Sequence, residues 1–363
     1  MRILHTESSL GWGGQEIRVL LDAHDAALQG HDVTCCISAG SKFVERASFC
    51  DERVKFKVAC IERKSFASLL SMMRVLRELK PDVVVTHSST DSWLVTVASV
   101  LVSCHFRIVR VRHISTPVGR SIFSRWLYRK ARAVITTSDE IAGLIRRIGG
   151  VGIVESIPTG VDVDVWQPPF TEQKIKARKQ LGVPVDCLCV GMVSTLRSWK
   201  GHRYAIEALR HLPYAILVVV GDGPQEENLR RLALEYNVSN RIVFKGYTKD
   251  VVEVMHGFDV FLQPSTSNEG VSQAVLQAMA CALPCIVSDI GGLNEPIHKN
   301  TKSGLLISPH SVSAIVKAVD QIYSNTDLGR ELGQTARSNV ELNYSRSLSW
   351  NKFAGVLDAV AKN

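Results

Sequence analysis

A polar loop between a predicted strand and a predicted helix carries the most informative residues of this chain. The segment 264–280 leaves an apolar strand and turns helical near Val271. The amide N–H groups of Gly270, Val271 and Ser272 are then free at a helix N-terminus, where backbone donors bind phosphate. Glu269 precedes them and either caps the helix or faces a ligand. Taken alone, this segment is more simply explained as an ordinary helix cap.

A second loop follows another predicted strand and carries two cations. Residues 190–201 run from an apolar strand through Arg197 and Lys200 to a helix expected near His202. Cations at the carboxyl end of a parallel strand lie where a diphosphate would bind. A solvated basic loop is the alternative for either residue alone.

The first half of the chain places glycines and histidines after predicted strands. Gly13 and Gly14 follow the first strand and let a phosphate or sugar approach the backbone. His87 and His113 each end a strand, so we expect both at one edge of the sheet, near a ligand. A single histidine there would more simply be structural. Neither this glycine loop nor Gly221–Pro224 completes the G-x-G-x-x-G pattern of NAD-binding proteins.

Asp162-Val163-Asp164 spells Asp-x-Asp, a pattern with which many sugar transferases hold a metal. It falls in the predicted linker, far from either phosphate loop, so we expect a turn there and no metal. The chain contains neither a G-x-S-x-G elbow nor an H-E-x-x-H motif, which leaves hydrolase functions without support.

Short apolar strands alternate with helices along the whole chain, the pattern of a parallel sheet covered on both faces. The expected strands are 2–6, 33–38, 83–87, 108–113 and 133–137, then 187–193, 215–221, 242–246, 260–264 and 285–288. A Pro- and Lys-rich break at 158–184 separates the two series. We therefore expect two Rossmann-like α/β domains facing each other across a cleft, 1–165 and 166–344, with a helix over 345–363 packing back on the first.

Composition bounds the functional class. The 363 residues are 45% hydrophobic and 21% charged, which suits folded domains of about 150 residues each and excludes a disordered chain. The longest apolar run, 93–104, is too short to span a bilayer, and the start of the chain has no secretory pattern. The nine cysteines form no Cys-x-x-Cys pair and indicate reduced thiols in the cytoplasm.

Basic residues are concentrated in the window 107–132, which includes the fourth predicted strand and the segment before the fifth. Eight lie in a window without acidic residues: Arg107, Arg110, Arg112, Arg120, Arg125, Arg129, Lys130 and Arg132. Ile122, Phe123, Trp126 and Leu127 fall on one side of a helix in this window. The pattern fits equally an interfacial helix on the inner face of an anionic membrane and a solvated basic face over a core stripe. No nucleic-acid recognition motif accompanies the charge, so we expect no nucleic-acid partner.

Taken together, these segments resemble the family 4 glycosyltransferases, which have two Rossmann-like domains in the arrangement called GT-B. The resemblance spans almost the whole chain as an ordered set of motifs: 13–16, 134–140, 157–162, 196–201, 218–224, 243–247, 269–284 and 288–295. It implies retaining transfer of a sugar from a nucleotide-sugar to an acceptor, with no essential metal and no cofactor besides that substrate.

The resemblance assigns roles by position. Lys200, with Arg197, would neutralise the diphosphate, and the N–H groups at Gly270, Val271 and Ser272 would bind its distal phosphate. Glu269 would contact the donor sugar. The remaining implied contacts are Gly14 with the diphosphate, Gly246 and Tyr247 with the base, and Gly13, Glu16, His87 and His113 on the acceptor side. Of these, Glu269, His113 and Lys200 are the implied catalytic residues.

Two positions depart from the family pattern. Gln277 stands where a second glutamate is expected to bind the ribose, and Thr195 stands where an arginine often precedes the lysine. Both changes affect nucleotide contacts. We expect a transferase using a UDP- or GDP-sugar and a lipid-linked, lipopolysaccharide or polysaccharide acceptor. A degenerate, non-catalytic glycan- or partner-binding protein and a nucleotide-sugar epimerase remain the alternatives, and the oligomeric state stays open.

Overall fold

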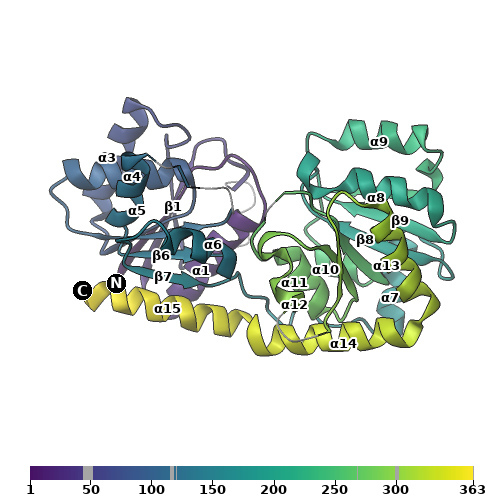
Figure 1. Ribbon diagram of the computed structural model, residues 1–363. Coiled ribbons are helices and arrows are strands. Elements are labelled where there is room, and N and C mark those ends of the chain that lie inside the picture. Colours follow the sequence, from purple (N-terminus) through teal and green to yellow (C-terminus); the bar gives the residue numbers. More distant parts are fainter. Residues whose placement is uncertain (44–51, 115–117, 120, 268, 299–301, 363) are drawn as a thin grey trace. The chain divides into compact units, whose positions relative to one another are not determined.

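The computed structural model describes residues 1–43, 52–114, 118–119, 121–267, 269–298 and 302–362. Its contacts divide the chain into two compact units. The first comprises Met1–Thr159 with Ser349–Asn363, and the second comprises Gly160–Leu348 (Figure 1).

The unit boundaries lie at 159/160 and 348/349, rather than at 165/166 and 344/345 as the sequence predicts. Backbone hydrogen bonds explain the difference. The N–H of Val161 donates to the carbonyl of Tyr344 at 2.9 Å, and the N–H of Arg346 donates to the carbonyl of Val161 at 2.8 Å. The start of the linker is thereby tied to the second unit, where Val161 is part of the core.

Within the described residues, the first unit holds a sheet of seven strands in the order β3-β2-β1-β4-β5-β6-β7, and neighbouring strands run parallel. The strands are β1 (Arg2–Glu7), β2 (Asp32–Ser38), β3 (Lys55–Ala59), β4 (Val83–Thr86), β5 (Arg107–Arg112), β6 (Ala133–Thr136) and β7 (Ile153–Ser156). The central strands are buried on both faces, which explains their continuous apolar runs. Because they run parallel, their carboxyl ends share one edge.

Helices cover both faces of this sheet (Figure 1). They are α1 (Gly14–Leu28), α3 (Phe66–Leu79), α4 (Ser89–Leu101), α5 (Ile122–Lys130) and α6 (Asp139–Arg146). One core layer holds α1, and a second holds α3, α4 and α6. Apolar residues at helical spacing supply the faces that these helices bury.

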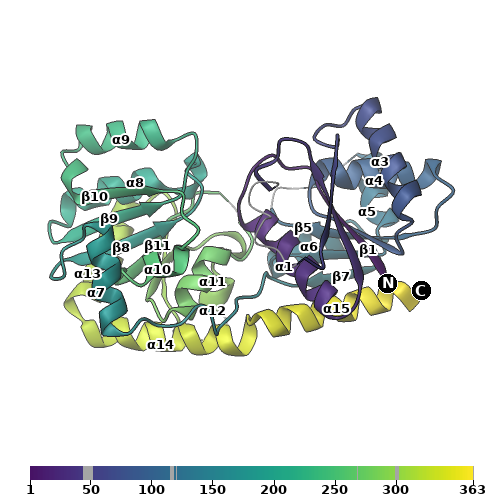
Figure 2. The same cartoon turned by 180° about the vertical axis from the view of Figure 1, so that it is seen from behind.

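The last helix, α15 (Arg346–Lys362), closes the core layer that contains α1. Phe353, Val356, Leu357 and Val360 are buried against β1 and α1. The amino end of β1 and the end of α15 lie side by side in both ribbon views (Figure 2). The two ends of the described chain thus complete one hydrophobic core.

The second unit contains, in the part of the chain that is described, six parallel strands in the order β10-β9-β8-β11-β12-β13. They are β8 (Leu188–Val193), β9 (Ala215–Val220), β10 (Ile242–Gly246), β11 (Val260–Gln263), β12 (Cys285–Ser288) and β13 (Leu305–Ile307). The helices are α7 (Thr171–Leu181), α8 (His202–Ala208), α9 (Glu226–Glu235), α10 (Val251–Met255), α11 (Gln273–Ala280), α12 (Glu295–His298), α13 (Val312–Ser324) and α14 (Thr326–Asn343).

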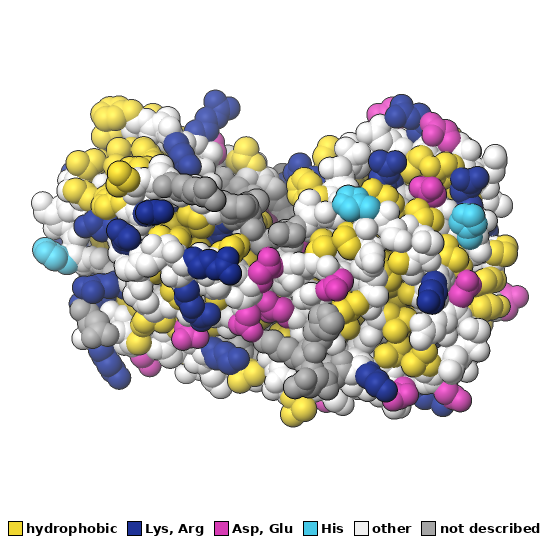
Figure 3. Space-filling model, viewed as in Figure 1, with side chains coloured by type: hydrophobic (Ala, Val, Ile, Leu, Met, Phe, Trp, Pro, Cys, Tyr) yellow, Lys and Arg dark blue, Asp and Glu magenta, His cyan; other side chains and the backbone are white. Residues whose placement is uncertain are grey.

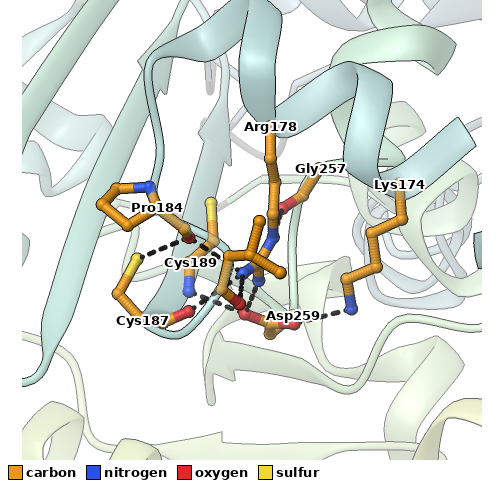
Figure 4. Close-up of polar contacts among 8 residues, drawn as sticks. Lys174, Arg178, Pro184, Cys187, Cys189, Gly257 and Asp259 are labelled. Carbon is orange, nitrogen blue, oxygen red and sulfur yellow. Dashed lines mark hydrogen bonds and ion pairs between the residues drawn. The ribbon is translucent and has the colours of Figure 1, made fainter. Parts of the chain in front are cut away.

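An ion pair of the buried Arg178 anchors α7 to the second sheet (Figure 4). The Arg178 guanidinium pairs with Oδ2 of Asp259, which also accepts the N–H of Cys189 at 2.8 Å. Lys174 Nζ reaches Oδ1 of Asp259 at 2.7 Å. Arg178 also donates to the carbonyls of Gly257, Pro184, Val185 and Cys187. The predicted entry helix is therefore fixed at the opposite edge of the sheet from the carboxyl ends of the strands.

Candidate functional site

Three neighbouring strands of the second unit end in loops that contact one another. Two glycines allow these contacts. Gly201, after the β8 loop, has φ +77°, and a Cβ there would lie 1.8 Å from the carbonyl oxygen of Pro264 after β11. Gly221, after β9, has φ +128°, and its Cβ would lie 2.1 Å from the carbonyl oxygen of Ser194. Only glycine tolerates both the dihedral angle and the approach.

These loops bring Lys200 and Glu269 together. Nζ of Lys200 lies 2.7 Å from Oε2 of Glu269, and the side chains are 18% and 14% exposed. The same carboxylate oxygen accepts a hydrogen bond from Nε2 of Gln263 at 3.3 Å. Oε1 of Gln263 in turn accepts the hydroxyl of Ser272 at 2.9 Å. A cation, a carboxylate, an amide and a hydroxyl thus form one connected network at the edge of the sheet.

Several buried polar atoms at this edge lack a hydrogen-bond partner among the described residues. In the second unit all five such side-chain atoms belong to residues at or after the carboxyl ends of strands: His202 Nδ1, Ser265 Oγ, Glu269 Oε1, Gln273 Oε1 and Ser288 Oγ. Buried polar groups are nearly always paired in folded proteins. Their concentration here indicates a place prepared for a polar ligand.

Helix α11 begins two residues later than the sequence suggested. Its first helical residue is Gln273, and Ser272 is the N-cap, without a side-chain cap bond. The amide N–H groups of Gly270, Val271 and Ser272 precede the helix instead of forming its first turn. Backbone donors therefore extend from this short loop into the helix.

The other predicted donor contacts lie around the same edge. Arg197 is exposed, with its guanidinium 5.8 Å from the centre of the Trp199 ring. The carbonyl of Gly246, at the end of β10, accepts the N–H of Gly221 at 2.9 Å, and Tyr247 follows it on the surface. Gln277 is half-buried in α11, one helical turn after Gln273.

His202 lies behind the lysine loop as the first residue of α8. Burial, together with the nearby Lys200 charge, lowers its pKa to about 4. The ring is therefore neutral at pH 7, and its Nε2 lies 3.1 Å from the hydroxyl of Ser194. Its role is to hold the loop without adding charge.

In the first unit, the two predicted histidines are joined by a third. His5 in β1, His87 after β4 and His113 after β5 lie in one row, with ring centres 5.3 and 5.6 Å apart. The sequence prediction that His87 and His113 converge is confirmed by their contact. His5 was missed because it lies inside an apolar strand, where a polar residue gives little signal.

Acidic residues surround the glycine loop of the first unit. Gln15 Nε2 donates to Glu7 Oε2 at 2.6 Å, and the N–H of Ser9 donates to Oε1 at 2.8 Å. Burial and the neighbouring Asp91 and Glu16 raise the pKa of Glu7 well above its usual value. Glu16 itself is 5% exposed.

Asp91 was also missed, although the sequence contained its signal. Ser88 and Asp91 form a capping box at the start of α4. Asp91 also accepts the hydroxyl of Thr6 at 2.7 Å and the N–H of His87 at 2.9 Å. The capping box thus fixes the backbone that carries His87.

The glycine loop itself is not sterically strained. Gly13 caps α1 in an extended conformation, and a Cβ there would meet nothing closer than Oε2 of Glu16 at 3.7 Å. Gly14 is the first residue of α1. A glycine at position 13 is therefore not required by the protein's own packing.

The turn predicted at Asp162-Val163-Asp164 is confirmed. Oδ1 of Asp162 accepts hydrogen bonds from the N–H groups of Asp164 at 3.1 Å and Val165 at 3.3 Å, which is an Asx turn.

The eight cysteines that the structure describes are all free thiols.

The basic run of the first unit does not form one surface. Arg110 is buried with its guanidinium 4.0 Å from the centre of the Tyr128 ring, and Arg112 donates to the Tyr128 hydroxyl. Ile122, Arg125 and Lys130 on α5 are exposed. Arg120 lies outside the described residues. Only part of the predicted charge therefore faces solvent.

Comparisons with known proteins agree with this architecture. The family model described as Glycosyltransferase Family 4 matches residues 12–165, and the model described as Glycosyl transferases group 1 matches residues 173–339. Together they cover most of both units.

Curated relatives match over much of their length. The chain is 28% identical over 276 residues to UDP-Gal:alpha-D-GlcNAc-diphosphoundecaprenol alpha-1,3-galactosyltransferase of Escherichia coli, covering 71% of this chain and 70% of the relative. It is 27% identical over 284 residues to 2-deoxystreptamine glucosyltransferase of Streptomyces kanamyceticus, covering 71% and 72%.

Solved structures share the fold. HepE of Anabaena, solved with UDP and glucose, superposes with a TM-score of 0.86 at 20% identity over 99% of this chain and all of that one. WaaG, a glycosyltransferase involved in lipopolysaccharide biosynthesis, gives a TM-score of 0.75 at 16% identity over 96% and 98%. Two Rossmann-like units and matches to both family models agree with the ordered motifs, and the chain belongs to the family 4 glycosyltransferases of GT-B fold.

Proposed function

We propose that this protein transfers a sugar, with retention of anomeric configuration, from a nucleotide-sugar to a lipid-linked or polysaccharide acceptor. The observation that carries the proposal is the Lys200–Glu269 pair, with the unpartnered Oε1 of Glu269 beside it. The names of relatives support the substrate class, since the Escherichia coli protein is described as acting on a diphosphoundecaprenol acceptor with UDP-Gal.

In this proposal Lys200 binds the diphosphate of the donor. The bond between the anomeric carbon and the phosphate oxygen breaks, and that oxygen takes the electron pair. A cation fixed beside it stabilises the charge that develops, the effect that usually contributes most to such catalysis. The exposed side chain of Arg197 supplies a second positive charge. The N–H groups at Gly270, Val271 and Ser272 bind the distal phosphate.

Glu269 then binds the sugar. Its Oε1 is buried and unpaired among the described residues, so a sugar hydroxyl that donates to it removes a desolvation penalty of about 1–3 kcal/mol. The acceptor oxygen attacks the anomeric carbon from the face that the phosphate leaves. The acceptor proton passes to the departing phosphate oxygen.

The two cations also support transfer without a divalent metal, because they supply the positive charge that a metal would otherwise provide. Activity is then expected to survive EDTA. Loss of activity in EDTA, restored by Mg²⁺ or Mn²⁺, would contradict this part of the proposal.

For the donor we propose a UDP- or GDP-sugar, with Gly246 and Tyr247 beside the base and Gln277 at the ribose. A glutamine binds a hydroxyl with one acceptor and one donor instead of a carboxylate. We expect nucleotide binding that is weaker than a glutamate would give. Thermal melting with UDP, GDP, ADP, CMP and their sugar conjugates tests the donor class, since a ligand at 100 times its Kd stabilises by about 2.7 kcal/mol.

The alternative of a non-catalytic binding protein rests on Gln277 and Thr195. It predicts no shift from any nucleotide and activity only after Gln277→Glu. Release of nucleotide by the native protein excludes it, and sugar isomers formed without acceptor would indicate the epimerase instead.

We also propose that α5 contacts an anionic membrane from the cytoplasmic side. Ile122 and Phe123 are 87% and 47% exposed, and Arg125 and Lys130 of the same helix are exposed too. Figure 3 shows hydrophobic side chains together with Lys and Arg side chains over the part of the first unit that carries α3, α4 and α5. None of the described helices combines the length and hydropathy needed to cross a bilayer.

Exposed apolar side chains on a helix that also carries exposed cationic side chains are typical of helices that lie in the membrane interface. Sedimentation with anionic vesicles at low salt tests this contact. Binding is expected to fall in Ile122→Ser/Phe123→Ser and at high salt. Equal binding by this double variant and the native protein would contradict it.

A further inference from the structure

Gln263 is a polar residue at the end of an otherwise apolar strand. It follows residues 260–262 in β11 and is only 2% exposed. Both ends of its amide have partners in the candidate site. Nε2 donates to Oε2 of Glu269 at 3.3 Å, and Oε1 accepts the hydroxyl of Ser272 at 2.9 Å. A buried amide is costly unless it is paired, and both side-chain partners of this one belong to the segment that leads into α11.

The residues of this network fix the direction of its hydrogen bonds. The ammonium of Lys200 can only donate, and the carboxylate of Glu269 that it contacts at 2.7 Å can only accept. The amide of Gln263 must therefore turn Nε2 toward the carboxylate, which leaves its Oε1 as an acceptor. The hydroxyl of Ser272 then has to donate its proton to Oε1. The opposite amide orientation would place two acceptors against each other.

The start of α11 shows how the hydroxyl of Ser272 is used. Ser272 is the N-cap of this helix, a position where a serine hydroxyl usually accepts a hydrogen bond from a backbone N–H of the first turn. It makes no such side-chain cap bond. The hydroxyl is directed to Gln263 instead, so the network runs from the carboxylate to the first residues of α11.

Gln263 also affects which oxygen of Glu269 is left for a ligand. Lys200 and Gln263 both contact Oε2, whereas Oε1 is buried and has no partner within the described part of the chain. The last torsion of a glutamate is broad and nearly two-fold, so with Lys200 alone either oxygen could face the ammonium. A second donor on the same oxygen, held by a strand and not by a loop, opposes that rotation.

We propose that Gln263 is a positioning residue that holds Glu269 with Oε1 free for a hydroxyl of the donor sugar. The site thereby distinguishes a nucleotide-sugar from the free nucleotide. The identity of the ligand rests on the proposed function, in which other groups bind the diphosphate. Loss of the Gln263 amide is therefore expected to weaken binding of the nucleotide-sugar and to leave binding of the free nucleotide nearly unchanged.

Nitrogen NMR of the ligand-free full chain, labelled with ¹⁵N in the glutamine side chains, tests the contact without any substrate. The signals of Gln263 are identified by their loss in Gln263→Met. We expect its amide protons to exchange slowly with water and to shift in Glu269→Gln. Fast exchange, with no shift in Glu269→Gln, would overturn the proposal.

Calorimetric titration tests the role, with UDP and UDP-glucose or GDP and GDP-mannose as probes, whichever pair binds the native protein. Gln263→Met keeps the volume of the side chain without its amide. We expect it to raise the Kd of the nucleotide-sugar about five- to tenfold, because one hydrogen bond to a charged group is lost, and the Kd of the nucleotide less than about twofold. Equal weakening of both ligands would indicate general damage to the site and overturn the positioning role.

Two further variants complete this comparison. Gln321→Met, at an exposed position of α13, is the matched control and should bind both ligands as the native protein does. Ser272→Ala keeps every backbone donor but removes the hydroxyl that orients the amide. It should raise the Kd of the nucleotide-sugar relative to that of the nucleotide by about two- to threefold, and it serves as the test if Gln263→Met does not fold.

A double variant shows whether Gln263 acts through Glu269. In the Glu269→Gln background, Gln263→Met should change the ratio of the two Kd values by less than about twofold, because no carboxylate remains to be positioned. An equally large change in both backgrounds would overturn the role of Gln263.

The same titrations separate this inference from the proposed function. If the native protein binds none of the probes, the proposed function fails. If it binds them and the ratio of the two Kd values is native in Gln263→Met and Ser272→Ala, only the role of Gln263 fails.

Discussion

Nζ of Lys200 lies 2.7 Å from Oε2 of Glu269, although 69 residues separate them in the sequence. Each residue compensates the charge of the other at the edge of the sheet. In the proposed mechanism, an incoming diphosphate must share or replace the carboxylate as the partner of Lys200. Hydrogen bonds from the sugar hydroxyls to Glu269 would then compensate for the weakened ion pair, so the proposal favours binding of a complete donor over a free diphosphate.

Replacing Lys200 by alanine should lower kcat by about 100-fold or more, because one stabilising charge on the leaving group is lost. The measurement is nucleotide release in the presence of donor and acceptor. Lys317→Ala, at an exposed position of α13, is the control and should retain native turnover. Native turnover in Lys200→Ala would contradict the assignment.

The same pair predicts a non-additive effect on stability. Lys200→Ala leaves the largely buried carboxylate of Glu269 without its cation, which should cost about 1–3 kcal/mol of unfolding free energy. Adding Glu269→Gln removes that charge and should recover part of the loss. Denaturant unfolding of the native protein, Lys200→Ala, Glu269→Gln and the double variant measures the coupling free energy between the two residues. Strictly additive changes would show that the pair does not interact.

The anchor of α7 should matter much more than a surface ion pair. Asp259→Ala leaves the buried Arg178 guanidinium uncompensated, with an expected cost of about 3–5 kcal/mol. Glu235→Ala removes the partner of Arg231 in an exposed pair at 3.7 Å and should cost less than about 0.5 kcal/mol. Similar thermal unfolding of the two variants would contradict the structural role of the anchor.

Gly201 should not tolerate a side chain. In Gly201→Ala the added Cβ meets the Pro264 carbonyl at 1.8 Å in a backbone conformation with positive φ, so the loops that carry Lys200 and Glu269 must separate. We expect lower stability and weaker nucleotide binding. Gly143→Ala, inside α6 with nothing within 4 Å of its Cβ, should instead raise stability by about 0.5–1 kcal/mol.

His202 should make the protein less stable in mild acid. Its pKa is about 4 in the folded state, against 6.5 as the ordinary value, so the unfolded chain binds a proton first as the pH falls. Stability is therefore lost between pH 6.5 and 4, by about 2 kcal/mol from pH 7 to 5. His202→Gln keeps a donor for Ser194 but does not titrate.

The loss of stability between pH 7 and 5 should be smaller by that amount in His202→Gln. The raised pKa of Glu7 has the opposite effect, but it is common to both proteins. If the free energy of unfolding depends on pH in the same way in the native protein and in His202→Gln, this contribution of His202 is excluded.

The fold could be predicted where the strands are buried on both faces. β4, β6 and β12 are runs of apolar residues and were found at nearly their observed bounds. β3 was missed because its side chains alternate between exposed and half-buried positions and include Lys55 and Lys57. β13 was missed because it has only three residues, too few for a period.

The candidate site was predicted from position at strand ends. Lys200 and Glu269 were both named from the sequence, but their direct contact required Gly201 and Pro264 to bring two loops together. The third histidine, His5, could not be predicted, because its contact with His87 depends on the pairing of neighbouring strands.

The packing of α15 on β1 determines when the core of the first unit can be completed during translation. The second unit is continuous, and all its residues leave the ribosome before residue 349 does. The first unit lacks Phe353, Val356, Leu357 and Val360 until the last helix has emerged. The core of the first unit is therefore completed only after every residue of the second unit has been synthesised.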